Sequence, residues 1–330
     1  MSLVPKDPAP QPKPKPSPGS ANLQLRLDDL KQIDATELQR RLLELFRSPN
    51  YKPPVLPAIA FELTELSRRK TVSYDEVART VEKDPVIAGS LLKLAQSPLY
   101  GGGRARVQSL RDALNRLGVN KLRDAVWQVV MDMRLFRADG FSEALTHLQS
   151  HTAFTAHAAR IIAQHASLVS EHAFLAGLIH DVGWNGMLIV ISEISPSAEA
   201  SPPLMAALDH IHSEVGATMV KMWGVSDEIV ELVRTHHDPP AAGKPVSPLF
   251  HAVRLAEKLA IEFGFAGQRM LQEYEDRAAL LGEALAVVDA SPPDSAETAI
   301  AALGLTNKMD LVREQVEQAA LQVEGGQFSD

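Results

Sequence analysis

The chain has 330 residues, 45% hydrophobic and 22% charged, which is the composition of a globular protein with one large core or two smaller ones. It contains no cysteine, so a disulfide scaffold, a cysteine nucleophile and a thiolate metal site are excluded, and a bound metal would need imidazole and carboxylate ligands. The formal net charge of −8 argues against wholesale nucleic-acid binding, and the twelve acidic and four basic residues from residue 268 onward account for all of it.

The first 33 residues are rich in proline and lysine, and their start, MSLVPKDPAPQPKPKPSPGSA, has no apolar core region. This composition predicts an extended, disordered linker and not a signal peptide. No segment elsewhere has the unbroken apolar length that crosses a bilayer. We therefore expect a cytoplasmic protein without a membrane partner.

Apolar residues recur at helical spacing from residue 35 onward. The stretch ATELQRRLLELF places its leucines on one face of a helix over 35–46. Ser73 with Glu76 three residues later forms a capping box. Further helices are predicted within 51–67, 71–84, 86–97, 109–118 and 121–136.

Sustained two-residue alternation is absent from the whole sequence, so we predict an all-α fold. Residues 34–140 are expected to form an N-terminal helical subdomain. Residues 141–266 are expected to form a second bundle that carries the histidines, and 267–330 an appended set of acidic helices.

Residues 101–123 contain six basic residues and one acidic residue. In a helix, turn, helix pattern they could read DNA. A solvated face on two packed helices explains them better, since the charges alternate with leucines and no aromatic residue is interleaved. The glycines at 101–103 lack the following Lys-Ser or Lys-Thr pair of a phosphate loop. We therefore do not expect a nucleic-acid partner.

All eleven histidines lie beyond residue 146, which indicates a ligand site. On a helix His180 and Asp181 would point about 100° apart, so a metal touching both must lie near a helix end. The same angle between His236 and His237 lets one bind while the other flanks or orients it. The alternative is purely structural, with His180 and Asp181 capping a helix end and the other imidazoles bonding to backbone carbonyls.

The order of these motifs resembles the HD superfamily, specifically the HDOD domain of bacterial signalling proteins. FLAGLIHDVGW follows His151-Thr152 and precedes HSEVGATMVKMWGVSDEIVELVRTHHDP. VLPAIAFEL, VEKDPVIAGSLLKLAQSPLYG and SLRDALNRLGVNKLRD are similar to the amino-terminal helices of that domain. The resemblance covers about 55–239 and continues more weakly through VRLAEKLA.

The resemblance implies two packed helical bundles and a metal constellation. The implied ligands are His151, His180, Asp181, His212, His236 and Glu257, the last standing where catalytic relatives have an aspartate. Imidazoles and carboxylates suit divalent iron, manganese, zinc or nickel.

The sequence departs from the HD-GYP phosphodiesterases, which are similar in this region. Trp184 stands where those enzymes have a lysine, and the GYP loop after the double histidine is missing. The expectation is thus a signalling or regulatory protein that acts by protein–protein contact, with a vestigial or structural metal site. A signalling partner is implied, and a homo-oligomer stays open. The alternative is a metal-dependent phosphohydrolase acting on a nucleotide or cyclic dinucleotide. The absence of the lysine and of the GYP loop favours the non-enzymatic interpretation.

Overall fold

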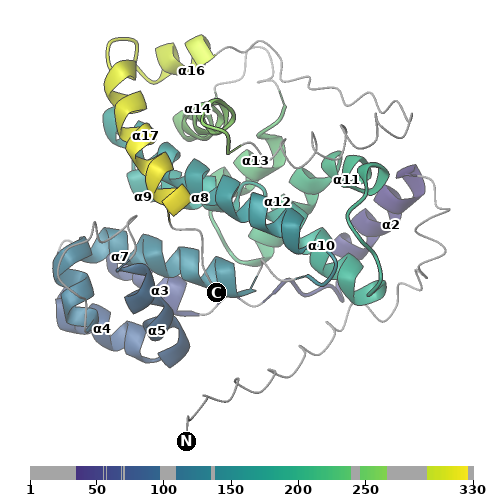
Figure 1. The fold of residues 1–330 in the computed structure, drawn as a ribbon, viewed down its shortest axis with the longest axis horizontal. Helices are drawn as coiled ribbons and strands as arrows, with labels where there is room; N and C mark the ends of the chain where they lie inside the picture. Colours follow the sequence, from purple (N-terminus) through teal and green to yellow (C-terminus); the bar gives the residue numbers. More distant parts are fainter. Residues whose placement is uncertain are drawn as a thin grey trace, which may run out of the picture.

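The structure is a computed structural model that describes residues 35–54, 56, 58–67, 69, 71–96, 109–134, 138–238, 246–265 and 296–325. The regular elements within these residues are all α-helices, as predicted. The predicted linker and the glycine loop at 101–103 lie outside the described residues. Figure 1 shows two groups of helices side by side, with the last helices along one flank.

Within the described residues the smaller group contains four helices, drawn at the lower left of Figure 1: α3 (Ala58–Ser67), α4 (Tyr74–Glu82), α5 (Pro85–Leu94) and α7 (Leu110–Arg134). Helix α4 begins where the capping signal predicted it, since the Ser73 hydroxyl accepts from the Asp75 amide at 3.2 Å. The Glu76 side chain pairs with Arg69 at 2.9 Å. The second half of the predicted capping box is therefore absent from the described contacts.

Helix α7 joins two segments that the sequence predicted as separate helices. They meet at Gly118, whose φ of 72° lies in the left-handed region. A Cβ here would meet nothing within 4 Å, so the backbone angle alone favours glycine. The kink starts a new helical direction at residue 119.

The larger group contains seven helices: α8 (Ser142–His165), α9 (Ser170–Ile179), α10 (Val182–Ile194), α11 (Pro202–Asp209), α12 (His212–Met222), α13 (Asp227–Thr235) and α14 (Pro248–Glu262). Helix α8 packs along α9 and α14, and α10 packs on α12. Apolar side chains of α8 and α10 lie on more than one face of each helix and are buried. A helix that is apolar all round belongs in the interior, and these helices form the centre of the bundle.

Helix α2 (Ala35–Arg47) packs on α11 and α12 of the larger group. Gln39 donates to the Ala207 carbonyl at 3.0 Å, and Arg47 pairs with Glu214 at 3.2 Å. The chain then reaches α3 through a proline-rich segment, where Trp223 donates to the Pro54 carbonyl at 3.1 Å. The sequence grouped α2 with the following helices, whereas the structure places it against the other bundle.

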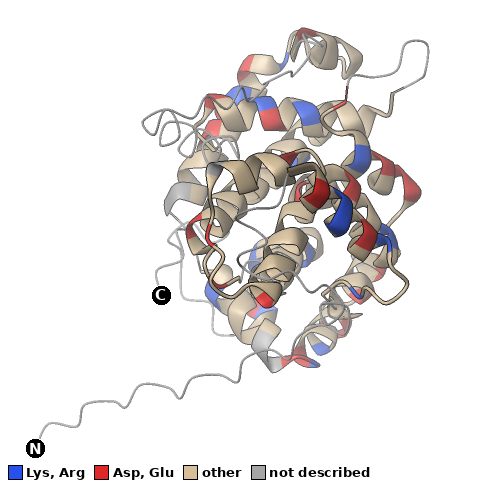
Figure 2. Cartoon of the chain, turned by 90° about the vertical axis from the view of Figure 1, so that its right-hand side faces the viewer, with Lys and Arg blue, Asp and Glu red and all other residues tan. Residues whose placement is uncertain are grey.

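The described part of the C-terminal region is helical. Helix α16 (Ala296–Ala302) packs on α14, and α17 (Met309–Gly325) packs along α8. Val312 and Val316 are fully buried, and Lys308 donates to the His165 carbonyl at 2.8 Å. On the side of the molecule drawn in Figure 2, charges of both signs are interspersed over the helices.

One stretch, His172–Ile194, is long and apolar enough to cross a membrane by length and composition, although the sequence was expected to contain none. It comprises α9 and α10, which His180 and Asp181 separate. Because 89% of its most apolar window is buried inside the protein, packing in the helical core accounts for its composition.

Candidate metal centre

Asp181 lies at the centre of a cluster of imidazoles. It is the second residue after the end of α9 and the N-cap of α10, so its carboxylate lies at a helix junction. Its Oδ2 lies 3.4 Å from the Nε2 atoms of His151 and His180. Its Oδ1 lies 3.4 Å from Nε2 of His212 and 3.3 Å from Nε2 of His236. The carboxylate therefore faces two pairs of imidazoles at once.

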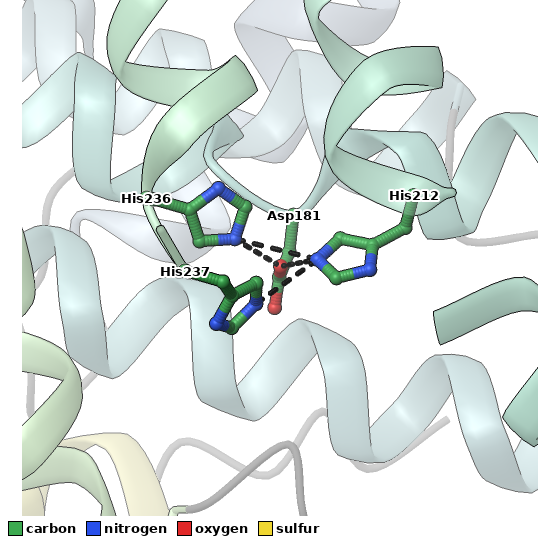
Figure 3. A group of neighbouring side chains, drawn as sticks. All are labelled: Asp181, His212, His236 and His237. Atoms are coloured by element: carbon green, nitrogen blue, oxygen red, sulfur yellow. Dashed lines mark hydrogen bonds and ion pairs between the residues drawn. The ribbon is translucent and has the colours of Figure 1, made fainter. Parts of the chain in front are cut away.

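The ligand atoms form two groups, each with all its atoms within 4.8 Å of one another. We call His151, His180 and Glu257 the first ligand group, and Asp181, His212, His236 and His237 the second ligand group. Figure 3 shows the second group, with His212 on one side of Asp181 and His236 and His237 on the other. The second oxygen of Asp181 faces the first group, so this carboxylate joins the two.

Backbone carbonyls fix the orientation of four of these rings. Each Nδ1 lies at hydrogen-bond distance from a carbonyl oxygen: His151 to Phe265 at 2.7 Å, His180 to Gly177 at 2.8 Å, His212 to Asp209 at 2.6 Å and His236 to Val233 at 2.8 Å. A carbonyl only accepts, so each Nδ1 carries the proton. In the neutral ring Nε2 then presents a lone pair to the centre of the site.

These lone pairs face one another at short range. Nε2 of His151 lies 3.1 Å from Nε2 of His180, and Nε2 of His212 lies 3.1 Å from that of His237 and 3.4 Å from that of His236. Two lone pairs at this distance repel unless a cation lies between them, either a proton or a metal ion. Carbonyl-oriented imidazoles around carboxylates are the donor set of a transition-metal site. The residues therefore fit such an ion.

Burial and charge act differently on the groups of the site. Burial disfavours the charged form of His180, but the nearby Asp181 and Glu257 carboxylates outweigh it and raise its pKa to about 9. Burial disfavours ionised Asp181, but the imidazoles of His180, His151 and His236 hold the pKa of this carboxyl well below its usual range. Burial lowers the pKa of His212 to about 4 and that of His237 to about 3. The imidazoles of His212 and His237 thus stay in the neutral form that binds metals.

All six residues that the resemblance implied come together in this cluster, from five helices and the junctions between them. The sequence left His237 as a flanking residue, yet its Nε2 joins the second group. His236 is the C-cap of α13 and His237 lies in the turn that follows, and their ring centroids are 4.1 Å apart.

A close contact between α10 and α12 positions the second group. A Cβ on Gly183 would lie 1.8 Å from the His212 carbonyl oxygen, and one on Gly216 would lie 3.1 Å from the Gly183 amide nitrogen. Only glycine permits such an approach. Trp184, the next residue, is buried, and its ring stacks on His212 with centroids 5.4 Å apart and planes 21° apart.

The structure also places a cation beside the second group. Arg254 is buried on α14, on the same side as Glu257 three residues later, and its Nη1 donates to the Asp238 carbonyl at 2.9 Å. Asp238 directly follows His237. Burial is the main cause of the low pKa of His237, and the charge of Arg254 contributes to it. Arg254 was not among the residues predicted from the sequence, although its three-residue spacing from Glu257 could have indicated it.

A histidine-aspartate pair at a helix junction, with further imidazoles converging from neighbouring helices of an all-α bundle, defines a protein of the HD superfamily. The particular family follows from the sequence. Residues 54–239 match the HDOD domain, and the chain belongs to that family.

Solved structures support the fold. A protein from Shewanella amazonensis, whose name proposes a metal-dependent phosphohydrolase, is 20% identical, with a TM-score of 0.59 over 88% of this chain and 99% of its own. An HDOD domain protein of unknown function from Geobacter sulfurreducens is 22% identical, with a TM-score of 0.57 over 86% and 99%. An uncharacterized protein from Treponema pallidum is 23% identical over 212 residues, 62% of this chain and 41% of that protein. The chain spans about two-fifths of the length of the curated relatives it matches.

Proposed function

We propose that this chain is a regulatory protein of signal transduction, which holds divalent transition-metal ions in its HD site and acts by contact with other proteins. The main observation in favour of metal binding is the orientation of the imidazole rings. Four imidazoles are locked with Nε2 inward, and three Nε2 pairs face one another at 3.1 to 3.4 Å with an ionised carboxylate between the groups.

Each of the two ligand groups would hold one metal ion. His151, His180 and Glu257 would hold an ion on the Oδ2 side of Asp181, and His212, His236 and His237 one on the Oδ1 side. A bound ion supplies Lewis acidity. The carbonyls behind the rings keep the proton on Nδ1, which raises ligand basicity and fixes each ring in place.

The position of Trp184 favours a regulatory role over an enzymatic one. Its indole packs against the outer face of His212 and is buried, so it fills space beside the second group with an apolar, neutral surface. Phosphoryl chemistry needs a cation that takes up charge developing on the phosphate oxygens. At this position the chain has none.

A metal-dependent phosphohydrolase is the second candidate, and Arg254 favours it. This buried guanidinium lies next to the residue that follows His237 and could serve an anion at the second group from the opposite helix. The two candidates share the metal and differ in whether a phosphate ester is cleaved.

Metal analysis and turnover separate these proposals. Protein purified without chelator or histidine tag should contain about two divalent ions per chain, as in sites with two bridged ligand groups. With manganese, iron, zinc or nickel added, we expect no multiple turnovers of nucleotides or cyclic dinucleotides. Turnover that vanishes in both Asp181→Ala and Arg254→Ala would establish the enzyme instead. Protein that binds none of the four ions would refute the metal site.

A further inference from the structure

A second site lies away from the metal centre, in an open cavity of about 370 Å³ between α7 and α8. It is next to the kink at Gly118, and its walls include the first residues of the new helical segment. Six of its nine described lining residues carry polar or charged side chains: Asn120, Lys121, Arg123, Asp124, Arg160 and Gln164.

Among the described residues of these walls, three carry a positive charge and one, Asp124, carries a carboxylate, so the charges are unbalanced. Asp124 is buried and accepts from Nε of Arg123 at 3.0 Å and from Nη1 of Arg160 at 3.0 Å. Lys121 is exposed, and within the described residues it has no ion pair. Low-dielectric walls with an excess of positive charge concentrate anions.

Arg160 is held as a rigid donor. Its Nη1 donates to Asp124, its Nη2 donates to Nδ1 of His157 at 3.0 Å, and its guanidinium lies 5.5 Å above the centre of the Phe174 ring. These bonds use two of its five N–H groups, and the others have no partner within the part of the chain that the structure describes. A guanidinium fixed on three sides loses little entropy on binding a phosphate.

His157 stays neutral and keeps this arrangement in place. Burial, together with the charges of Arg160 and Lys121, holds its pKa well below the ordinary value. Because arginine only donates, Nδ1 of His157 is the acceptor.

The N-terminus of the helical segment after Gly118 adds to the positive potential in the cavity. The segment after Gly118 begins with Val119, Asn120 and Lys121, all on the cavity wall. The first N–H groups of a helix lack carbonyl partners in their own segment, and the helix dipole favours an anion there.

We propose that this cavity binds the phosphate group of a small phosphorylated molecule, with Lys121 and Arg160 as its principal donors. A phosphate here would bridge α7 of the smaller bundle to α8, the helix that carries His151. Occupancy would thus tie the two bundles together and transmit a metabolite signal toward the HD site. This site does not require that the metal centre be filled.

Titration calorimetry on the full chain, with inorganic phosphate and adenosine monophosphate as probes, tests the proposal. Lys121→Glu is the main variant because the side chain is exposed and free of ion pairs within the described structure. Lys221→Glu is the matched control, an equal charge change at an exposed position of α12. Arg160→Lys keeps the charge but loses the planar fork, and its melting temperature reports whether it folds.

We expect saturable binding of at least one probe to wild type and to Lys221→Glu. Binding should weaken about tenfold or more in Lys121→Glu, as for loss of one charged hydrogen bond. Tighter binding of adenosine monophosphate would identify an organic phosphate as the ligand, and equal binding a free phosphate. No saturable binding of either probe up to about 10 mM would overturn the proposal. So would equal affinity of Lys121→Glu and wild type, or binding of duplex DNA alone with a steep salt dependence.

Discussion

The contact between α10 and α12 can be tested by replacing Gly183 with alanine. The new Cβ would lie 1.8 Å from the His212 carbonyl oxygen and 2.7 Å from the Gly216 amide nitrogen, whereas ordinary contacts are 3.4 to 4 Å. Both neighbours are backbone atoms, so the helices themselves must separate, by roughly 1.5 Å. His212 would then move away from Asp181, to which its Nε2 is 3.4 Å distant.

Overpacking of this kind costs about 1–3 kcal/mol or more, and a backbone clash belongs at the upper end. A loss of about 3 kcal/mol corresponds to a fall of about 6–12 °C in the melting temperature of a domain of this size. We also expect the second ligand group to lose its ion, because a displacement of about 1.5 Å exceeds the tolerance of a metal–nitrogen bond.

Calorimetry and metal analysis on the purified variant measure both effects. Gly89→Ala is the matched control: this glycine is exposed on α5, and a Cβ there would meet nothing within 4 Å. Alanine should stabilise that helix by about 0.5–1 kcal/mol and leave the metal content unchanged. A Gly183→Ala protein with the melting temperature and metal content of the wild type would refute the close approach of the two helices.

His180→Ala and Asp181→Ala should each abolish bound metal and lower the melting temperature measured with metal present, since a ligand that binds only the folded state stabilises it by about 2.7 kcal/mol at 100 times Kd. Unchanged metal content in both would eliminate the site, and His165→Ala should retain its metal. Metal affinity should rise with pH from 6.5 to about 9, because the ion must displace the proton that the raised pKa keeps on His180; a flat affinity over that interval would contradict this. Val316→Ala should cost about 1.5 kcal/mol by calorimetry, because it removes two buried methyl groups; no loss would show that α17 is not docked on α8.

The helices themselves were predictable because their cause is local. Leu38, Leu42, Leu45 and Phe46 recur at helical spacing, and all four are buried in α2. The bundle against which that face packs was not predictable. The periodicity of apolar residues defines a face of α2 but does not specify the helices on which that face packs. The prolines before α3 indicate an extended segment but do not specify the direction in which it runs.

The residues that gather around Asp181 could be predicted from the sequence, and their geometry could not. The order of motifs implied six ligand residues, and the structure brings all six together. His237 was left as a flanking residue because its place in the group depends on the 3.1 Å approach of its Nε2 to that of His212, which is a long-range contact. Arg254 was missed because its relevance depends on α14 lying beside Asp238, which is a long-range contact.

Three histidines of the candidate site also bond to the ends of helices. His180, His212 and His236 each bond through Nδ1 to the carbonyl three residues earlier, in the last turn of α9, α11 and α13. Carbonyls in the last turn of a helix have no amide partner within it, so these rings supply one. A descendant of this chain that had lost its ions would still be under selection to keep these imidazoles as helix ends. Persistence of the three histidines among relatives therefore reports on helix termination, and only measured metal content reports on the ions.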